Sequence, residues 1–485
     1  MLRRLMQQSA TYGLAGALPR IASLILVPVL TRVMAPSEYG IVGICGIIAS
    51  LAATFMAFGM NGTLARFYQM PGDPVDRRRM VFTVVVTVLA LGAAVTALTL
   101  AVGPLVFPIL GDSAGFTFYP YAAIAVVSTY VNLPTSLAQS LCYARQRASV
   151  YTMLQFGSVA LMTAFVLILT VGFRGGALGQ ITGQLIAAVC MLPVGALVLW
   201  PHLGKHFSRE WMRRALHFGW PLVPHVLFGW ALTLSDRLIL NRYTSLAQVG
   251  VYSLAYSLSM AVMMVTGALN QAWTPMYYRL AEAKDWVSIS RGNTVVSVAC
   301  AAACVALALF STEVVTLLAG QAYWGATAFM PILVGAYYLQ SVYFVMCTPI
   351  FYGLRTRLVP VLSGVAAAAN VTLNLLLIPQ YGAMVAAWTT LLAYAIMAGA
   401  AWVIGARMHP QAFAQWRLLR LLVITALSIA VSVRLESLPA WDLKTLGLKF
   451  LLLAAAGGLV LATRVVTVTE VRTVLAAGRR RLRGA

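Results

Sequence analysis

Long apolar runs without a charged residue constrain this chain more than any other feature of its sequence. Apolar residues make up 61% of the chain and charged residues 9%, against roughly 45–50% and 25% in soluble domains. The chain is therefore predicted to be an all-α polytopic membrane protein. The uncharged runs each fit one or two crossings at about 20 residues per helix, and they include residues 81–111, 113–144, 149–173, 175–204, 243–278, 314–354 and 358–406.

The spacing of these runs predicts fourteen transmembrane helices. The connections between them are short, which leaves no room for a soluble catalytic domain. The short positive N-terminus has no clear cleavage site behind it, so the first apolar segment is read as a retained span and not a signal peptide. The expected spans are 9–33, 38–60, 81–103, 119–141, 150–172, 176–200, 218–240, 249–272, 294–311, 328–350, 358–378, 383–405, 418–434 and 446–463.

The basic residues predict the orientation. With the N-terminus in the cytoplasm, 26 of the 34 Lys and Arg fall in cytoplasmic segments, as the positive-inside rule requires. An even number of spans then places both termini in the cytoplasm. The net charge of +22 is thereby explained by topology and by anionic lipid headgroups, without a nucleic-acid partner. The exceptions are Arg20, Arg32, Arg174, Arg237, Arg242, Arg434, Lys444 and Lys449.

The first twelve spans show an internal repeat with an offset of about 210 residues. Residues 39–41 (Tyr-Gly-Ile) match 249–251 (Val-Gly-Val), and 145–147 (Arg-Gln-Arg) match 355–357 (Arg-Thr-Arg). Six spans separate the copies, so both halves have the same orientation, as in transporters built from parallel repeats. We predict two like-oriented six-helix lobes followed by two further helices and a basic tail, with boundaries 1–205, 206–410 and 411–485.

Ionisable residues inside the first and seventh spans are the main candidates for a substrate site. Arg20 lies in the first span, and Asp236 and Arg237 lie in the seventh. Such groups are costly at membrane depth and usually face a water-filled cavity. Each of these spans also contains two prolines, and paired irregular helices at equivalent positions point to a transport site. The planar fork of arginine suits phosphate oxygens, so we predict a cationic cavity for an anionic headgroup.

Other interpretations of these residues stay open. Arg237 could instead reach the outer interface and pair with Asp236. Arg66, at the inner end of the second span, is either a third cavity cation or an ordinary positive-inside residue. Asp236 could couple transport to an ion or serve as the partner of Arg237, and His225 could titrate in a proton-coupled cycle or pack in the core.

No pattern in the sequence predicts a catalytic or metal centre. The six cysteines all lie in apolar spans and are read as small packing residues. Cys300 and Cys304 share a helical face, but two thiols without further ligands do not close a metal site. Glu313 is read as part of the capped start of a short interfacial helix over 314–318. We find no nucleophile–base pair and no phosphate-binding glycine loop, so neither an enzyme nor a cofactor is expected.

Three stretches resemble a known family of membrane proteins. Residues 9–44 (SATYGLAGALPRIASLILVPVLTRVMAPSEYGIVGI), 218–259 (FGWPLVPHVLFGWALTLSDRLILNRYTSLAQVGVYSLAYSLS) and 270–279 (NQAWTPMYYR) are similar to the signatures of bacterial polysaccharide and O-antigen flippases. These form the Wzx-like branch of the MOP superfamily, which also contains the MATE drug exporters and the lipid II flippases. The resemblance covers most of the first twelve spans.

The resemblance implies a MOP-type fold of fourteen helices in two lobes, in the bacterial inner membrane. Its substrate would be a polyprenyl-diphosphate-linked oligosaccharide for O-antigen, capsule or exopolysaccharide synthesis, carried from the cytoplasmic to the periplasmic leaflet. The diphosphate-binding arginines of such flippases fall on Arg20 and Arg237. Lipid II flippases also have an arginine inside the second span, which has none here (38–60), so the site of that branch is not transferred. Binding of polysaccharide polymerase or chain-length proteins, and the identity of the glycan and coupling ion, stay open.

Two other functions remain alternatives. A multidrug or small-solute exporter of the same superfamily would need acidic residues in its cavity to attract organic cations, whereas the core spans here hold arginine and few carboxylates. A membrane-embedded glycan polymerase or ligase would need a sizeable periplasmic loop with catalytic groups, and the longest predicted outside loop has about 15 residues.

Overall fold

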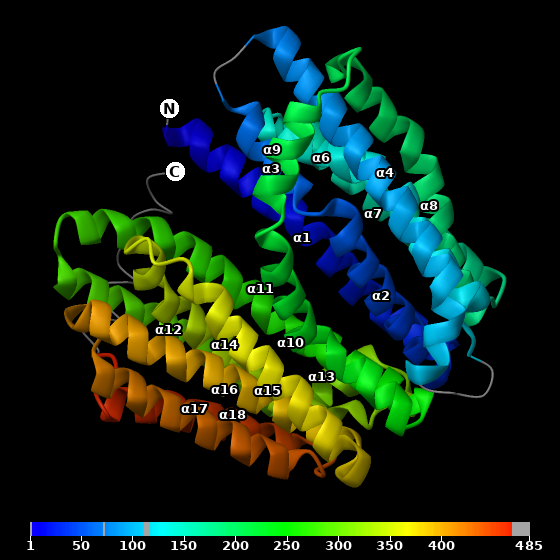
Figure 1. Cartoon of the computed structure of the whole chain (residues 1–485). Coiled ribbons are helices and arrows are strands. Elements are labelled where there is room, and N and C mark those ends of the chain that lie inside the picture. Colours follow the sequence, from blue (N-terminus) through cyan, green and yellow to red (C-terminus); the bar gives the residue numbers. More distant parts are fainter. Residues whose placement is uncertain (1, 71–72, 111–115, 468–485) are drawn as a thin grey trace. The chain divides into compact units, whose positions relative to one another are not determined.

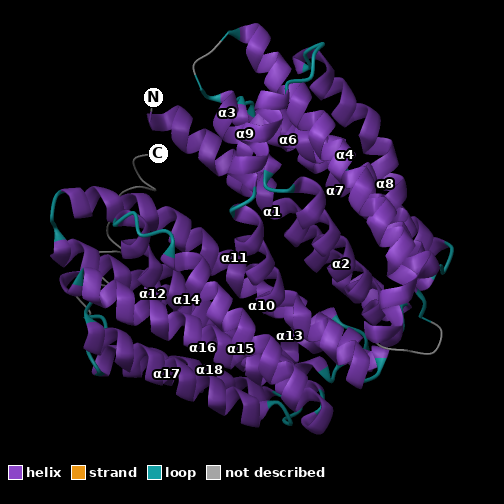
Figure 2. Cartoon of the chain, viewed as in Figure 1, coloured by secondary structure: helices purple, strands orange, loops and turns teal. Residues whose placement is uncertain are grey.

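The computed structural model describes residues 2–70, 73–110 and 116–467, with side chains for all of these except 2–14, 61, 110, 222 and 225. These residues form helices and loops without a strand (Figure 2). Twelve of the helices are long and apolar enough to span a membrane, which confirms the all-α membrane fold. The remaining two predicted spans form a helix divided at Asn132 and the helix Leu222–Tyr243, so the count of fourteen stays a prediction.

The chain divides into two compact units. Unit 1 contains residues 1–253 and 319–323, and unit 2 contains residues 254–318 and 324–485. The predicted boundaries at 205/206 and 410/411 stay predictions.

Unit 1 contains the helices from α1 to α10, which run from blue to green along the chain in Figure 1. Short helical segments follow α4 (107–110), precede α5 (118–122), follow α7 (168–172) and follow α8 (200–202). The main helices are α1 (Leu2–Val33), α2 (Pro36–Ala57), α3 (Met60–Tyr68), α4 (Pro74–Val106), α5 (Ala123–Val131), α6 (Leu133–Ala144), α7 (Ala148–Leu167), α8 (Gly176–Leu199), α9 (Arg209–Gly219), α10 (Leu222–Tyr243) and the first residues of α11 (Leu246–Glu282).

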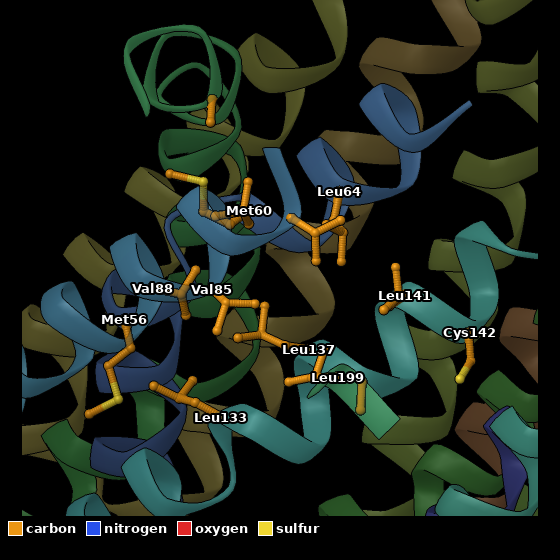
Figure 3. Packing of buried hydrophobic residues seen from close by; sticks show 14 of the residues in the cluster. Met56, Met60, Leu64, Val85, Val88, Leu133, Leu137, Leu141, Cys142 and Leu199 are labelled. Atoms are coloured by element: carbon orange, nitrogen blue, oxygen red, sulfur yellow. The ribbon is translucent and has the colours of Figure 1, made fainter. Parts of the chain in front are cut away.

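The core of unit 1 lies where α2, α3, α4 and α6 meet. Met56, Met60 and Leu64 from α2 and α3 are fully buried and face aliphatic side chains of α4 and α6 such as Leu137 and Leu141 (Figure 3). Because lipid tails are as apolar as these side chains, close packing and not exclusion from water holds such helices together. The amphipathic helix α9 covers this core with Trp211 and Leu216.

Two glycines at equivalent positions of the predicted repeat lie against each other. Gly40 of α2 approaches the carbonyl of Leu246, and Gly250 of α11 approaches the carbonyl of Pro36. A Cβ atom at either position would overlap these oxygens. The repeat itself stays a prediction, but this contact explains why a glycine occurs at both positions.

Unit 2 is built around one central helix, α14. Its neighbours α12, α16 and α17 pack along it, and α18 lies beside α17 (Figure 1). Tyr337 of α14 lies between Tyr256 and Tyr394, with ring centroids 5.8 and 6.4 Å away. The helices after α11 are α12 (Trp286–Leu309), α13 (Ser311–Leu318), α14 (Ala326–Tyr352), α15 (Leu358–Tyr381), α16 (Ala383–Met408), α17 (Gln415–Leu435) and α18 (Leu443–Ala462), with short turns at 321–323 and 410–412.

The two prolines predicted to interrupt the seventh span lie near its start, where α9 ends and α10 begins. Pro221 precedes the first residue of α10 and Pro224 lies in its first turn. A proline is tolerated there because the first amides of a helix have no intrahelical acceptor. The predicted span 218–240 is therefore divided near its first residues and α10 itself is uninterrupted, whereas Pro19 and Pro28 lie inside α1.

Candidate functional site

Arg20 is an exposed cation inside a candidate membrane helix. Its neighbours Ala15 and Ala22 are buried in unit 1, while Arg20 itself is exposed. The arginine makes no hydrogen bond or ion pair with the part of the chain that the structure describes. A guanidinium at this depth needs water or an anion, since lipid offers neither. The role of Arg20 in substrate binding stays a prediction. Its exposed guanidinium, without a partner in the described structure, is compatible with binding an anion.

Asp236 and Arg237 are buried near the far end of α10, with exposed fractions of 1% and 7%. Tyr252 of α11 donates a hydrogen bond of 2.5 Å to Oδ2 of Asp236, and the backbone N–H of Arg237 donates one of 2.8 Å to Oδ1. Both carboxylate oxygens are thus occupied. The aspartate therefore links α10 to the start of α11. Its role in ion coupling stays a prediction.

Arg242, five residues after Arg237 on α10, is bonded to the backbone of another segment. Its Nη1 donates a hydrogen bond of 2.5 Å to the carbonyl of Ile109, and its guanidinium lies 5.7 Å from the ring centre of Tyr243. Arg242 therefore closes the end of α10 onto the segment after α4.

Arg66 lies on α3, a separate short helix after a left-handed turn at Phe58 and Gly59. The side chain is exposed, and its guanidinium lies 5.6 Å from the ring centre of Phe218 at the end of α9. Such a contact is worth about 0.5–1 kcal/mol at an exposed site. Arg66 thus has a packing role at the α3–α9 corner, beside the substrate role that remains a prediction. His225 lies on α10, and its side chain is outside the described residues.

A buried ion pair in unit 2 was not predicted. Nζ of Lys449 on α18 donates to both carboxylate oxygens of Glu313, at 2.7 and 2.8 Å. Their side chains are 1% and 5% exposed. The sequence predicted a helix start for Glu313 and, for Lys449, only a place outside the cytoplasmic segments. The signal in the sequence was a single acid and a single base, each isolated in an apolar stretch.

Neutral polar side chains also join helices in unit 2. Nδ2 of Asn374 donates 3.1 Å to Oδ1 of Asn370 within α15, and the hydroxyl of Thr389 on α16 donates to Oδ1 of Asn374. Both asparagines are fully buried. Hydrogen bonds of this kind fix one helix against another in a membrane. Among the described residues no group of three His, Cys, Asp or Glu side chains could hold a metal ion.

Unit 1 contains a cavity of about 340 Å³ between α2, α5, α7 and α8. Its lining combines apolar walls with the polar side chains of Ser128, Thr129, Asn132, Ser158 and Gln184. The sequence analysis did not predict these residues, because it selected candidates that are ionisable and these side chains are neutral. The polar residues of the α5–α6 segment, where Asn132 precedes Pro134, were the available signal.

Comparison with known proteins decides the family. The family described as "polysaccharide biosynthesis protein" matches residues 5–281, more than half of the chain. The chain belongs to this family. Within it, this member is a multi-pass membrane protein whose matched region covers residues 5–253 of unit 1 and continues along α11 to Ala281. No curated protein matches the sequence.

Solved structures share the fold of this family member at low sequence identity. A lipid II flippase, MurJ in an inward closed conformation, matches 92% of this chain and 97% of its own with a TM-score of 0.72 and 13% identity. An inward-facing MATE multidrug resistance transporter of the MOP superfamily matches 81% of this chain and 95% of its own, with a TM-score of 0.64 and 16% identity. The MATE transporter DinF-BH matches 85% of this chain and 96% of its own, with a TM-score of 0.60 and 17% identity. The chain therefore shares the fold of these proteins of the MOP superfamily.

Proposed function

We propose that this protein is a flippase that moves a polyprenyl-diphosphate-linked oligosaccharide from the cytoplasmic to the periplasmic leaflet of a bacterial inner membrane. The product would feed synthesis of a surface polysaccharide such as O-antigen, capsule or exopolysaccharide. The observation that carries the proposal is the match to the polysaccharide biosynthesis family over residues 5–281. The fold shared with a lipid II flippase supports it, because that protein is also a flippase of a lipid.

The physical problem explains why such a protein is needed. A diphosphate with attached sugars cannot cross about 30 Å of hydrocarbon unaided, because unpaired charge in an apolar medium costs tens of kcal/mol on ideal solvation estimates. A protein must therefore offer a polar site that is exposed first to one membrane face and then to the other. The prenyl tail can stay in lipid throughout.

Arg20 is the residue we propose to bind the diphosphate. It is exposed, it lies in a candidate membrane helix, and it has no partner among the described residues. A diphosphate would supply the missing anion, and the guanidinium fork would bind two of its oxygens. Arg237 and Arg66 are secondary candidates, since one is buried and the other already contacts Phe218.

Deletion of the gene followed by lipid analysis tests the proposed function. We expect one diphosphate-linked oligosaccharide to accumulate on the cytoplasmic face, with loss of one surface polysaccharide. Unchanged lipid pools combined with altered drug sensitivity would instead favour a small-solute exporter, the alternative that the MATE-like fold allows.

A narrower test uses Arg20. The Arg20→Ala protein should reach the wild-type level in the membrane while surface glycan falls about tenfold or more, as expected for one charged contact of 1.5–3 kcal/mol. Arg20→Lys keeps the charge and should retain part of the output. Arg355→Ala, in an exposed turn after α14, is the matched control. Normal glycan output from Arg20→Ala would exclude the proposed role of this residue.

A further inference from the structure

The cavity in unit 1 lies near the middle of its helices. Gln184 is eight residues from Gly176 at the start of α8, and Ser128 is five residues from Ala123 at the start of α5, which the segment 118–122 precedes. At 1.5 Å per residue these positions are about 12 and about 8 Å from the starts of their helices. Half of a hydrocarbon layer is about 15 Å. The polar side chains therefore face a cavity at the depth where transporters bind their substrates.

The two helix ends used for this measure lie at one end of unit 1. The carboxylate of Glu38, in the first turn of α2, lies against Gly176. The segment before α5 contacts both α2 and α8. The depth of the cavity is therefore measured from helix starts at one end of unit 1, and it does not depend on the predicted orientation of the chain in the membrane.

Three polar side chains of the cavity lack a partner among the residues that the structure describes. The hydroxyl of Ser128 and the carboxamides of Asn132 and Gln184 make no hydrogen bond with this part of the chain. Each carboxamide offers two N–H donors and one oxygen acceptor. At membrane depth such groups must bind water or a ligand, because lipid cannot satisfy them. Asn132 lies at the junction of α5 and α6, where its backbone stays helical.

The lining excludes several kinds of occupant. No Asp, Glu, Lys or Arg is among the described residues that line the cavity, so neither a cation nor a free phosphate finds a countercharge there. A hydrocarbon tail would bury the three unpartnered groups without satisfying them, at a cost of about 1–3 kcal/mol each. The remaining chemistry is an uncharged molecule rich in hydroxyl groups.

The walls and the volume fit a sugar as well. Cys45, Met162 and Met191 supply flexible apolar surface beside the polar groups, and the C–H faces of a sugar ring pack on such side chains. The volume of about 340 Å³ lies at the lower end of ligand pockets. It would hold about eleven waters of about 30 Å³ each. Because covalently bonded atoms are closer together than separate waters, about one or two monosaccharide units fit.

We propose that this cavity binds uncharged monosaccharide units of the lipid-linked glycan. Asn132 and Gln184 contact sugar hydroxyls through their carboxamides, and Ser128 adds a third hydrogen bond. This inference rests on the proposed function and deepens it: the cationic site recognises the diphosphate that all such lipids share, and the cavity recognises the glycan that distinguishes them.

Binding measurements on the full-length protein in lipid nanodiscs test this inference. The two probes are undecaprenyl diphosphate and the lipid-linked oligosaccharide extracted from cells that lack the protein. We expect wild type to bind the sugar-bearing lipid at least tenfold more tightly than the bare lipid. Asn132→Leu and Gln184→Leu should each weaken binding of the sugar-bearing lipid about threefold to tenfold, as expected for the loss of one or two hydrogen bonds, and leave the bare lipid unchanged.

The control is Gln155→Leu, a half-buried glutamine of α7 outside the cavity lining, which should bind both lipids as wild type does. Equal wild-type affinity for the two lipids would overturn the cavity proposal and leave the flippase proposal intact. The same holds if the two cavity variants weaken both lipids equally. Failure of wild type to bind either lipid would overturn both proposals. The wild-type comparison needs no variant to fold, and Ser128→Ala provides a smaller change should the leucine variants be unstable.

Discussion

The ion pair between Glu313 and Lys449 offers a quantitative test of how the last helix is attached to unit 2. Lys449 is the seventh residue of α18, and its amine contacts both oxygens of Glu313 at 2.7 and 2.8 Å. Replacing Lys449 by Met removes the cation and leaves a carboxylate buried without its partner. Breaking a buried pair in this way costs about 3–5 kcal/mol.

The magnitude can be converted into a melting temperature. For a cooperative unit of 150–250 residues, 1 kcal/mol shifts Tm by about 2–4 °C, so Lys449→Met should lower Tm of unit 2 by about 6–20 °C. The double variant Glu313→Gln with Lys449→Met removes both charges. It should recover more than half of the loss, because paired charges in an apolar interior contribute little more than well-packed neutral side chains.

The measurement is thermal unfolding of purified protein in detergent, followed by tryptophan fluorescence. Trp441 is a useful reporter, since its indole N–H donates a hydrogen bond of 3.0 Å to Thr316 at the same α13–α18 contact. Lys444→Met is the matched control, because Lys444 lies on the same helix and is exposed. If Lys449→Met melts like Lys444→Met, or if the double variant is no more stable than the single one, the reasoning is refuted.

Three further variants test local packing and charge. Gly250→Ala should lower Tm by several degrees, because its Cβ would overlap a carbonyl oxygen of α2, whereas Gly267→Ala on the same helix meets no atom within 4 Å and should have little effect. Tyr252→Phe removes a hydrogen bond to Asp236 and should destabilise the α10–α11 contact by about 1.5–3 kcal/mol in chemical unfolding; no change would show that the carboxyl has another donor. Burial lowers the pKa of the His409 imidazole, so the folded state binds fewer protons than the unfolded state below about pH 6.5. Stability should therefore fall as the pH drops through that value, and His409→Phe should remove this part of the pH dependence in melts between pH 8 and 5.

The sequence predicted the existence of the helices well and their ends less well. The expected span 249–272 lies inside α11, which continues to Glu282, and the expected span 294–311 begins earlier, at Trp286. Hydropathy detects only the part of a helix that faces hydrocarbon. Capping decides where the helix starts, as at Asp285, whose carboxylate accepts a hydrogen bond of 3.0 Å from the N–H of Ser288.

The charged candidates were found because each is expensive at membrane depth, and a costly residue stands out in an apolar run. Their partners could not be predicted by the same logic. Glu313 and Lys449 are 136 residues apart, and nothing in either neighbourhood indicates the other. A preference for paired charges indicates only that some partner exists.

The cavity in unit 1 shows the complementary limit. Asn132 and Gln184 are 52 positions apart, and a neutral carboxamide in a long apolar helix costs too little to stand out as an arginine does. Neither residue is informative alone, since a lone polar side chain in a span usually bonds to its own helix, as Thr129 and Ser158 do here. The two become a candidate site only when α5 and α8 are placed side by side and neither carboxamide finds a partner in the described structure. Residues that recognise an uncharged ligand are therefore visible in the packing of the helices and not in their composition, whereas residues that recognise a charged one are visible in both.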